Sequence, residues 1–376
     1  MVLNTPPMGW NTWNTFGENI NEQLIMETAD MIVEKGYKDA GYEYVVIDDC
    51  WSMRKRDENG QLVADPVKFP HGMKYVADYI HSKGLKFGMY SCCGPLTCAG
   101  YPGSLDHELD DALFFAENGV DYLKYDWCYH PMTLEGWTLY NRMKMALAAT
   151  GRDIVFSVCN WGDEDTHSWI RKVGGDLYRS TGDIFDSFRS IKDIIDKEVE
   201  RFNQSGPSCY NDIDMLVCGM YGKGNVGGDG GCDTLGYETH FKLWCMLSAP
   251  LMIGGDIRNL DERMEKLLMN KELIRINQDP EQRPPIVMEK GQVLKLFRHV
   301  SGGEYVLSMT NFTDSPAEYK IFNLPDVGFP GYGEWGLELY DVDTGEYFGT
   351  FTTDVWVKRV EAHETKMYRG KVVKLR

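Results

Sequence analysis

Two patterns of apolar and polar residues alternate along roughly the first 280 residues of the chain. Short apolar runs are typical of buried strands, and the segments between them carry apolar residues at the spacing of amphipathic helices. Eight strands that alternate with helices over this length predict a (β/α)8 TIM barrel. The predicted strands cover residues 8–13, 42–49, 85–91, 121–126, 153–160, 176–183, 213–219 and 250–256.

An open, doubly wound sheet is built from similar units. It usually has a glycine-rich turn of the form G-x-G-x-x-G after its first strand, and no such turn follows residue 13. The pattern therefore favours the closed barrel.

The pattern changes after a proline-rich break, NQDPEQRPPI, at residues 277–286. Beyond it, short stretches such as VLKLFRHV and EYVLSMTNF alternate apolar and polar residues and are separated by turn residues. This arrangement is typical of an antiparallel β-sandwich. We therefore expect a catalytic barrel over residues 1–282 and a C-terminal antiparallel β-sandwich domain over residues 283–376.

Composition excludes two classes of partner. The chain has 376 residues, of which 43% are hydrophobic and 26% charged, as in ordinary globular proteins. Its formal charge is -18 and no Lys/Arg-rich block is present, so no nucleic acid and no membrane partner is expected. With neither a signal peptide at the N-terminus nor a run of about 20 apolar residues, we expect a cytoplasmic, bacterial protein.

Ten cysteines are present, and seven lie in or beside apolar, strand-like runs. This placement favours mostly reduced thiols. Cys92, Cys93 and Cys98 could bind zinc together with Cys128, but no C-x-x-C pair recurs at zinc-finger spacing. We expect no metal and no cofactor.

Polar and aromatic residues gather where six of the predicted strands end. In a parallel barrel, the C-terminal ends of the strands form the face that carries active sites. Charges in a barrel interior cost several kcal/mol unless they are paired or hydrogen-bonded. The candidates at this face are Trp13, Asp48, Asp49, Tyr90, Lys124, Asp126, Asn160, Trp161, Arg179 and Asp183.

Each candidate also has a purely structural interpretation. Strand-end aspartates often cap the following helix, Lys124 and Asp126 could form a structural ion pair, and Trp13 and Trp161 could be core residues. Together, however, carboxylates, indoles, a lysine, an arginine and an amide without a phosphate-binding loop indicate a carbohydrate site. Cleavage of a glycosidic bond also requires two carboxyl groups, one ionised and one protonated.

Seven motifs, in order, resemble those of glycoside hydrolase family 27, the α-galactosidases and α-N-acetylgalactosaminidases. The motifs are MGWNTW, GYEYVVIDDCW, LKFGMYS, VDYLKYDWC, RSTGDI, NDIDML and APLMIGGDIR. The resemblance implies a retaining exo-glycosidase with Asp126 as nucleophile and Asp183 as acid/base. It also implies that Lys124 and Arg179 bind the sugar, that Trp13, Asp48, Asp49 and Tyr90 line a galactose pocket, and that Cys98 and Cys128 form a disulfide.

The resemblance also bears on the substrate. Family members specific for galactose often have Glu at the position of Asn160, and those specific for N-acetylgalactosamine have Ser. Asn160 can bind a hydroxyl and is larger than Ser, so we expect an oligosaccharide substrate with terminal α-galactose, held also by Trp161. The alternatives are an α-N-acetylgalactosaminidase, a β-L-arabinopyranosidase, which the intact Asp48–Asp49 pair disfavours, or a carbohydrate-binding protein without catalysis.

Two further expectations concern charge and assembly. Lys124 should lower the pKa of Asp126, and the nearby negative charge should raise the pKa of Asp183. The Gly-rich loop at residues 221–234 should shape a cleft or a subunit contact, and together with exposed sandwich edges it would permit a homo-oligomer.

Overall fold

The N-terminal part of the computed structural model is a barrel of eight parallel strands in the order β7-β6-β5-β4-β3-β2-β1-β8. The structure describes residues 3–228, 230–329 and 333–375. The ring closes through a parallel bridge between Leu216 and Ile253. The predicted barrel is therefore confirmed. Its strands are β1 (Met8–Asn11), β2 (Tyr44–Val46), β3 (Lys86–Cys92), β4 (Tyr122–Asp126), β5 (Val155–Cys159), β6 (Leu177–Arg179), β7 (Tyr210–Asp212) and β8 (Leu251–Ile253).

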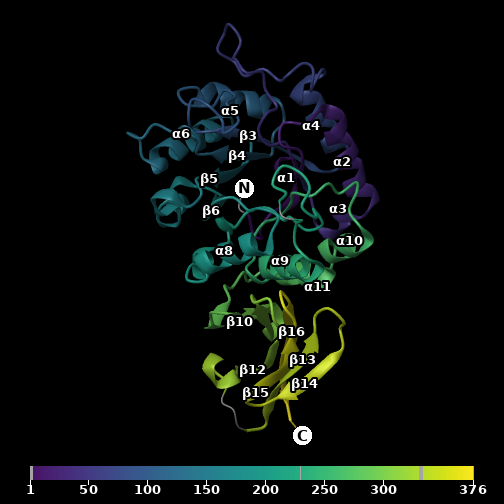
Figure 1. Cartoon of the computed structure of the whole chain (residues 1–376). Helices are drawn as coiled ribbons and strands as arrows, with labels where there is room; N and C mark the ends of the chain where they lie inside the picture. Colours follow the sequence, from purple (N-terminus) through teal and green to yellow (C-terminus); the bar gives the residue numbers. More distant parts are fainter. Residues whose placement is uncertain (1–2, 229, 330–332, 376) are drawn as a thin grey trace.

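Helices surround the barrel, as Figure 1 shows. The longer ones bury one apolar face, for example Leu24, Ile25 and Ile32 of α2, and several begin at a side-chain cap such as Asn21, which accepts from the Leu24 N–H at 2.8 Å. The helices are α1 (Trp13–Phe16), α2 (Glu22–Glu34), α3 (Tyr37–Ala40), α4 (Gly72–Ser82), α5 (Glu108–Glu117), α6 (Gly136–Ala149), α7 (Ile170–Val173), α8 (Phe188–Glu198), α9 (Thr234–Met246), α10 (Glu262–Leu268) and α11 (Lys271–Asn277). In the described part of the chain, no helix combines the length and apolar character needed to cross a membrane.

The seventh strand lies earlier than the apolar run at residues 213–219 predicted. The strand occupies Tyr210–Asp212, and the chain then turns at Asp214, whose φ is 80°. The Asp212 carboxylate accepts from the Asp214 N–H at 2.9 Å, which stabilises this turn. The positive φ of Asp214 interrupts the strand, so the predicted position was wrong for the pairing with β6, whereas Leu216, inside the predicted run, pairs with Ile253 of β8.

The C-terminal part is an antiparallel sandwich, as predicted. A six-stranded sheet in the order β14-β13-β16-β11-β10-β9 faces a two-stranded sheet, β12-β15, across an apolar core that includes Phe297, Leu307 and Val357. The strands are β9 (Ile286–Glu289), β10 (Val293–Val300), β11 (Glu304–Asn311), β12 (Ala317–Asn323), β13 (Trp335–Asp341), β14 (Tyr347–Phe351), β15 (Asp354–Val360) and β16 (Thr365–Lys374).

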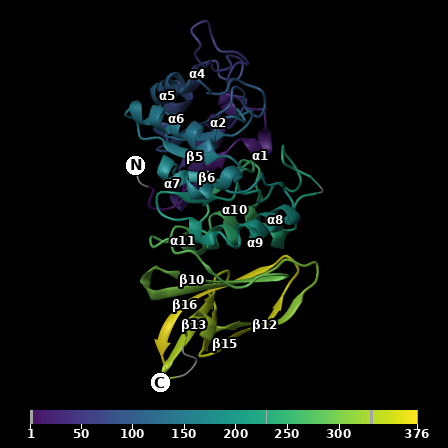
Figure 2. The ribbon, with the colours of Figure 1, turned by 90° about the vertical axis from the view of Figure 1, so that its left-hand side faces the viewer.

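One face of the six-stranded sheet packs against the barrel. Figure 2 shows β10 and β16 next to α9 and α11. Leu296, Val306 and Met367 of the sheet belong to the same buried cluster as the apolar residues of the barrel and its helices. The change from helices to strands falls between α11 and β9, and we propose residues 1–282 and 283–376 as the two domains.

A buried arginine joins the two parts. Arg298 of β10 is fully buried and donates to the carbonyls of Cys245 and Met246 at the end of α9, at 3.2 and 3.0 Å. It also donates to the Ser248 hydroxyl at 2.7 Å. Burial lowers the pKa of Arg298 to about 10, so the guanidinium stays charged at neutral pH and stabilises the negative end of the helix.

We therefore expect the Arg298→Met variant to lose about 3 kcal/mol of unfolding free energy, because buried carbonyl oxygens would lose their donors. Urea denaturation measures this loss. The Arg359→Met variant of the exposed arginine on β15 is the matched control and should leave the denaturation midpoint unchanged. Equal effects of the two substitutions would contradict the assignment of Arg298 as the junction residue.

Candidate active site

A cavity lies at the C-terminal ends of the barrel strands, and it encloses about 420 Å³ of space, including the solvent at its mouth. Eight of the ten predicted substrate-contacting and catalytic residues lie in its wall. The lining residues are Trp13, Asn14, Asp48, Asp49, Tyr90, Cys98, Lys124, Asp126, Arg179, Asp183, Asp214, Met215 and Val226.

Strand β4 places its polar residues by simple alternation. Tyr122, Lys124 and Asp126 share one face of the strand, which points into the barrel. Tyr122 belongs to an apolar cluster that also contains Tyr44 of β2 and Leu177 of β6, whereas Lys124 and Asp126 line the cavity. The apolar residue therefore lies deepest, and the two charged residues follow it towards the mouth.

Lys124 pairs with Asp48, from the end of β2. Its Nζ donates to Asp48 Oδ2 at 2.9 Å, and the Asn11 amide donates to the same oxygen at 2.8 Å. Burial alone would lower the pKa of Lys124, but Asp48 and other nearby acidic groups hold this pKa well above its usual range. The neighbouring Asp49 accepts from the Ala99 N–H at 2.9 Å.

Asp126 is almost completely buried, with 5% of its surface exposed. It accepts from the Tyr90 hydroxyl and from the Trp127 N–H, both at 2.9 Å. Burial raises the pKa of Asp126 to about 6, although Lys124 and these two hydrogen bonds act to lower it.

Asp183 lies at the mouth of the cavity, with 55% of its side chain exposed, and pairs with Arg179 at 3.1 Å. Arg179 also pairs with Asp214 at 3.2 Å. Burial acts to raise the pKa of Asp183, but Arg179 and Lys124 outweigh it and hold this pKa below its ordinary value.

The expected order of the two pKa values was therefore wrong. The pKa of Asp126 is the raised one and that of Asp183 the lowered one. Burial is the main cause of the raised pKa of Asp126. The choice of ion-pair partners adds to the difference, because Lys124 pairs with Asp48, whereas Arg179 pairs directly with Asp183.

Asn160 and Trp161 do not line this cavity. Asn160 is fully buried, and its amide bonds within its own loop, donating to the Asp163 carbonyl at 2.8 Å and accepting from the Thr166 hydroxyl at 2.5 Å. Trp161 follows with a φ of 57° and packs against the barrel core. The proposed contact of Asn160 with a sugar hydroxyl thus has no support from this geometry.

Four lining residues were not among the predicted set: Asn14, Asp214, Met215 and Val226. Asp214 pairs with Arg179 and accepts from the Ile184 N–H at 2.7 Å, so it braces the segment that carries Asp183. Asp214 lies in the motif NDIDML, but residues 213–219 were predicted to be a strand. Asp214 was therefore not counted among the residues at the strand ends.

Val226 belongs to the Gly-rich loop that was expected to shape a cleft or a subunit contact; it lines the cavity, which agrees with the first of these roles, and the second stays a prediction. Its backbone bonds Asn14 at 3.1 Å and Asp186 at 3.0 Å, which fixes the loop against two other parts of the wall.

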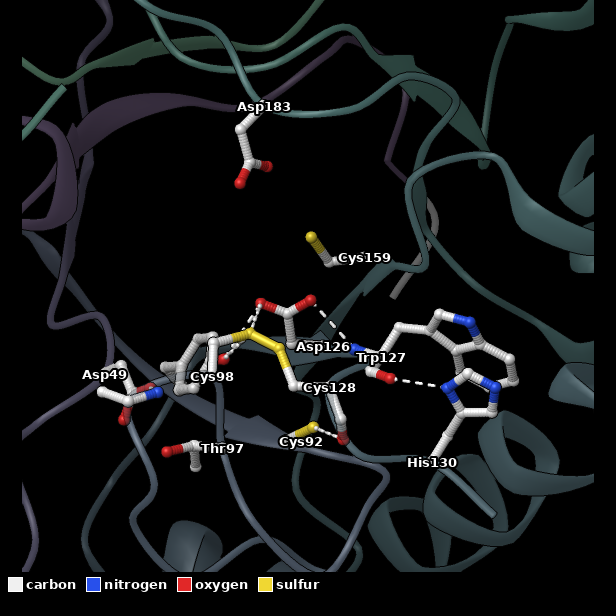
Figure 3. Close-up of a disulfide and its surroundings, with 12 residues drawn as sticks. Asp49, Cys92, Thr97, Cys98, Asp126, Trp127, Cys128, His130, Cys159 and Asp183 are labelled. Atoms are coloured by element: carbon white, nitrogen blue, oxygen red, sulfur yellow. Dashed lines mark hydrogen bonds between the residues drawn. A yellow bond between two sulfur atoms is a disulfide. The ribbon is translucent and has the colours of Figure 1, made fainter. Parts of the chain in front are cut away.

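The implied disulfide between Cys98 and Cys128 is present and connects the loop after β3 to the residues after β4. Figure 3 shows it directly beside Asp126, with Cys98 Sγ 3.5 Å from Asp126 Oδ2. The remaining eight cysteines are free and buried.

The raised pKa of Asp126 predicts a stability effect. The Asp126 carboxyl loses its proton near pH 4 in the unfolded chain and only near pH 6 in the folded chain. The folded wild type therefore loses stability relative to the unfolded chain as the pH rises from about 4 through about 6. A shift of about 2 pKa units corresponds to about 3 kcal/mol. The Asp126→Asn variant should therefore gain up to about 3 kcal/mol of unfolding free energy over the wild type between pH 4 and pH 7.

Urea denaturation at the two pH values measures this gain. The variant Asp193→Asn, on the exposed face of α8, serves as control and should show no such gain. A stability difference between Asp126→Asn and wild type that does not change with pH would argue against a raised pKa.

Known proteins resemble most of the chain. A family model described as alpha galactosidase A matches residues 5–279. Alpha-galactosidase 3 of Arabidopsis thaliana is 48% identical over 279 residues, which are 74% of this chain but only 61% of the plant protein.

Two solved structures extend the similarity to the C-terminal sandwich. Alpha-galactosidase I from Mortierella vinacea aligns with a TM-score of 0.90 and 33% identity over 98% of this chain and 97% of its own. Alpha-galactosidase from Saccharomyces cerevisiae with raffinose aligns with a TM-score of 0.87 and 30% identity over 98% of each chain. The chain therefore belongs to the alpha-galactosidase A family, glycoside hydrolase family 27.

Proposed function

We propose that this protein is a retaining exo-glycosidase that removes terminal α-linked galactose from oligosaccharides. The observation that carries the proposal is the pair Asp126 and Asp183, which line one cavity and point towards each other in Figure 3. Each has its own electrostatic surroundings, as a nucleophile and an acid/base require.

In the first step, Asp126 attacks the anomeric carbon while Asp183 donates a proton to the leaving oxygen. Lys124, the Tyr90 hydroxyl and the Trp127 N–H stabilise the negative charge on Asp126. The reactive form of the pair carries one proton, on Asp183. In the second step, ionised Asp183 accepts a proton from the water that hydrolyses the glycosyl-enzyme, and Arg179 stabilises that ionised form.

The rest of the wall holds the sugar. Asp48 and Asp49 are suited to accept hydrogen bonds from hydroxyl pairs, and the Lys124 ammonium can donate to a hydroxyl beside them. Trp13 and Tyr90 offer aromatic rings for the apolar face of the sugar. Asp214 joins this set because its carboxylate lines the same cavity.

Two observations favour galactose as the sugar that is released: the relatives are named alpha-galactosidases, and the Asp48–Asp49 pair is intact. Asn160, being enclosed in its own loop, contributes nothing to this choice. Assembly into a homo-oligomer and a cytoplasmic location both remain predictions from the sequence.

The wild-type chain should release nitrophenol from p-nitrophenyl α-galactoside. Its kcat/KM for this substrate should be at least about 100-fold higher than for the corresponding α-N-acetylgalactosaminide and β-L-arabinopyranoside, because contacts that favour galactose by about 3 kcal/mol in the transition state give this ratio. Proton NMR should detect α-galactose as the first product. The Asp126→Asn variant should be inactive, whereas Asp176→Asn, at the opposite end of the barrel, should retain activity. Turnover by Asp126→Asn, or β-galactose as first product, would overturn the proposal.

The second carboxylate has its own test. The wild-type pH profile of kcat/KM should be bell-shaped with its alkaline limb near pH 6, because the reactive pair carries one proton. In Asp183→Ala, an aryl substrate with a good leaving group needs no acid, so the alkaline limb should disappear and azide should accelerate turnover. If the pH profile of kcat/KM stayed bell-shaped in this variant, a residue other than Asp183 would be the general acid.

A further inference from the structure

The Cys98–Cys128 disulfide lies at the edge of the cavity, where a reductant can reach it. Cys98 is exposed and contributes to the cavity wall, whereas Cys128 and Asp126 are buried behind it. The Tyr90 hydroxyl donates to Asp126 at 2.9 Å and contacts Cys98 Sγ at 3.5 Å, so one phenol orients both groups. Figure 3 shows this cluster.

The three side chains bring one possible metal ligand each to the same place. One donor atom each from Cys98, Asp126 and Cys128 all lie within 4.8 Å of one another, and this is the one such set in the described residues. Two sulfur ligands at about 2.3 Å from one zinc ion lie at most about 4.6 Å apart. Opening the S–S bond therefore leaves two thiols that need only separate to ligand spacing.

The loop that carries Cys98 is held by contacts other than the disulfide. Thr97 and Gly103 donate backbone hydrogen bonds to Tyr101 and Pro95 at 2.8 and 3.0 Å. The Ala99 N–H bonds Asp49 at 2.9 Å. Cys128, which follows β4, is held separately, because the thiol of Cys92 at the end of β3 donates to the Cys128 carbonyl at 3.1 Å. Both cysteines are thus expected to stay beside Asp126 after reduction.

The charge of the cavity favours a cation. Five carboxylates line it, those of Asp48, Asp49, Asp126, Asp183 and Asp214, against the two cations Lys124 and Arg179. Soft thiolates with one carboxylate suit zinc and related divalent ions.

We propose that reduction of this disulfide converts Cys98, Cys128 and Asp126 into a three-ligand site for zinc that inactivates the enzyme. A dithiol supplies two electrons and two protons, the S–S bond breaks to two thiols, and the dithiol becomes a cyclic disulfide. The metal then displaces the two thiol protons and takes a carboxylate oxygen of Asp126, with a fourth position open to the cavity. Inactivation rests on the proposed role of Asp126 as nucleophile, but metal binding does not.

Cobalt is the probe, because thiolate-to-cobalt absorption reports sulfur ligands directly. The full chain is reduced with a dithiol, freed of it by anaerobic gel filtration and titrated with Co²⁺. We expect one equivalent to give the thiolate-to-cobalt band, and one equivalent of Zn²⁺ to abolish both this band and hydrolysis of the aryl α-galactoside until a chelator is added. The oxidised chain should show neither effect.

Ligand variants locate the site. Cys98→Ser and Cys128→Ser should each weaken Co²⁺ binding at least about 10-fold, and Asp126→Asn should weaken it while retaining the thiolate band. Cys92→Ser, which removes a buried neighbouring thiol, is the matched control and should bind Co²⁺ like the wild type.

Absence of the band in reduced wild-type chain, or an undiminished band in Cys98→Ser, would overturn the site. If the reduced chain binds the metal but the oxidised, metal-free chain hydrolyses no galactoside, the proposed function is overturned and the metal site is not. Circular dichroism of the reduced wild type verifies that the fold persists, and the comparison of oxidised with reduced wild type requires no variant.

Discussion

The distribution of two buried cations among five carboxylates is the constraint on which this site depends. Lys124 is committed to Asp48, and Arg179 is shared between Asp183 and Asp214. Among the described residues, Asp126 therefore has no direct ion pair, although only 5% of its surface is exposed. Its negative charge is supported by hydrogen bonds alone at close range, from Tyr90 and Trp127. Such a carboxylate is costly to the folded chain and correspondingly ready to react with a positive centre.

The scaffold makes this cost tolerable by placing the charged layer on a rigid base. The strand residues below Lys124 form an apolar layer across the barrel, and the helices outside it belong to a core that continues into the C-terminal sheet. Arg298 satisfies the carbonyl end of α9 across that junction. The sandwich therefore stabilises the same helices on which the barrel strands pack, even though none of its described residues lines the cavity.

Patterns along the chain were sufficient for the barrel, the sandwich and most of the cavity wall, because strand alternation decides which side chains face inwards. The predictions that failed depended on side-chain contacts that the apolar pattern does not encode, some of them between residues close in sequence. Nothing in the run IDMLVCG reveals that Asp214 adopts a positive φ and turns the chain towards Arg179. Asn160 lies where a strand-end residue should meet the substrate, but Thr166 folds back and encloses it. The partner of Lys124 could not be predicted either, since Asp126 is its neighbour in sequence and Asp48 its neighbour in space.

The reversed pKa order has a consequence for how a substrate enters. In the open cavity below about pH 6, the one proton of the pair lies on Asp126 and Asp183 is ionised beside Arg179, so Asp183 must acquire that proton as the sugar binds. A bound sugar removes water from the mouth, where Asp183 is most exposed, and this desolvation raises the pKa of the acid. The same sugar brings its anomeric carbon to Asp126, where positive charge develops and favours the ionised nucleophile. Substrate binding thus moves the proton from the enclosed carboxyl towards the exposed one, which is the arrangement that double displacement requires.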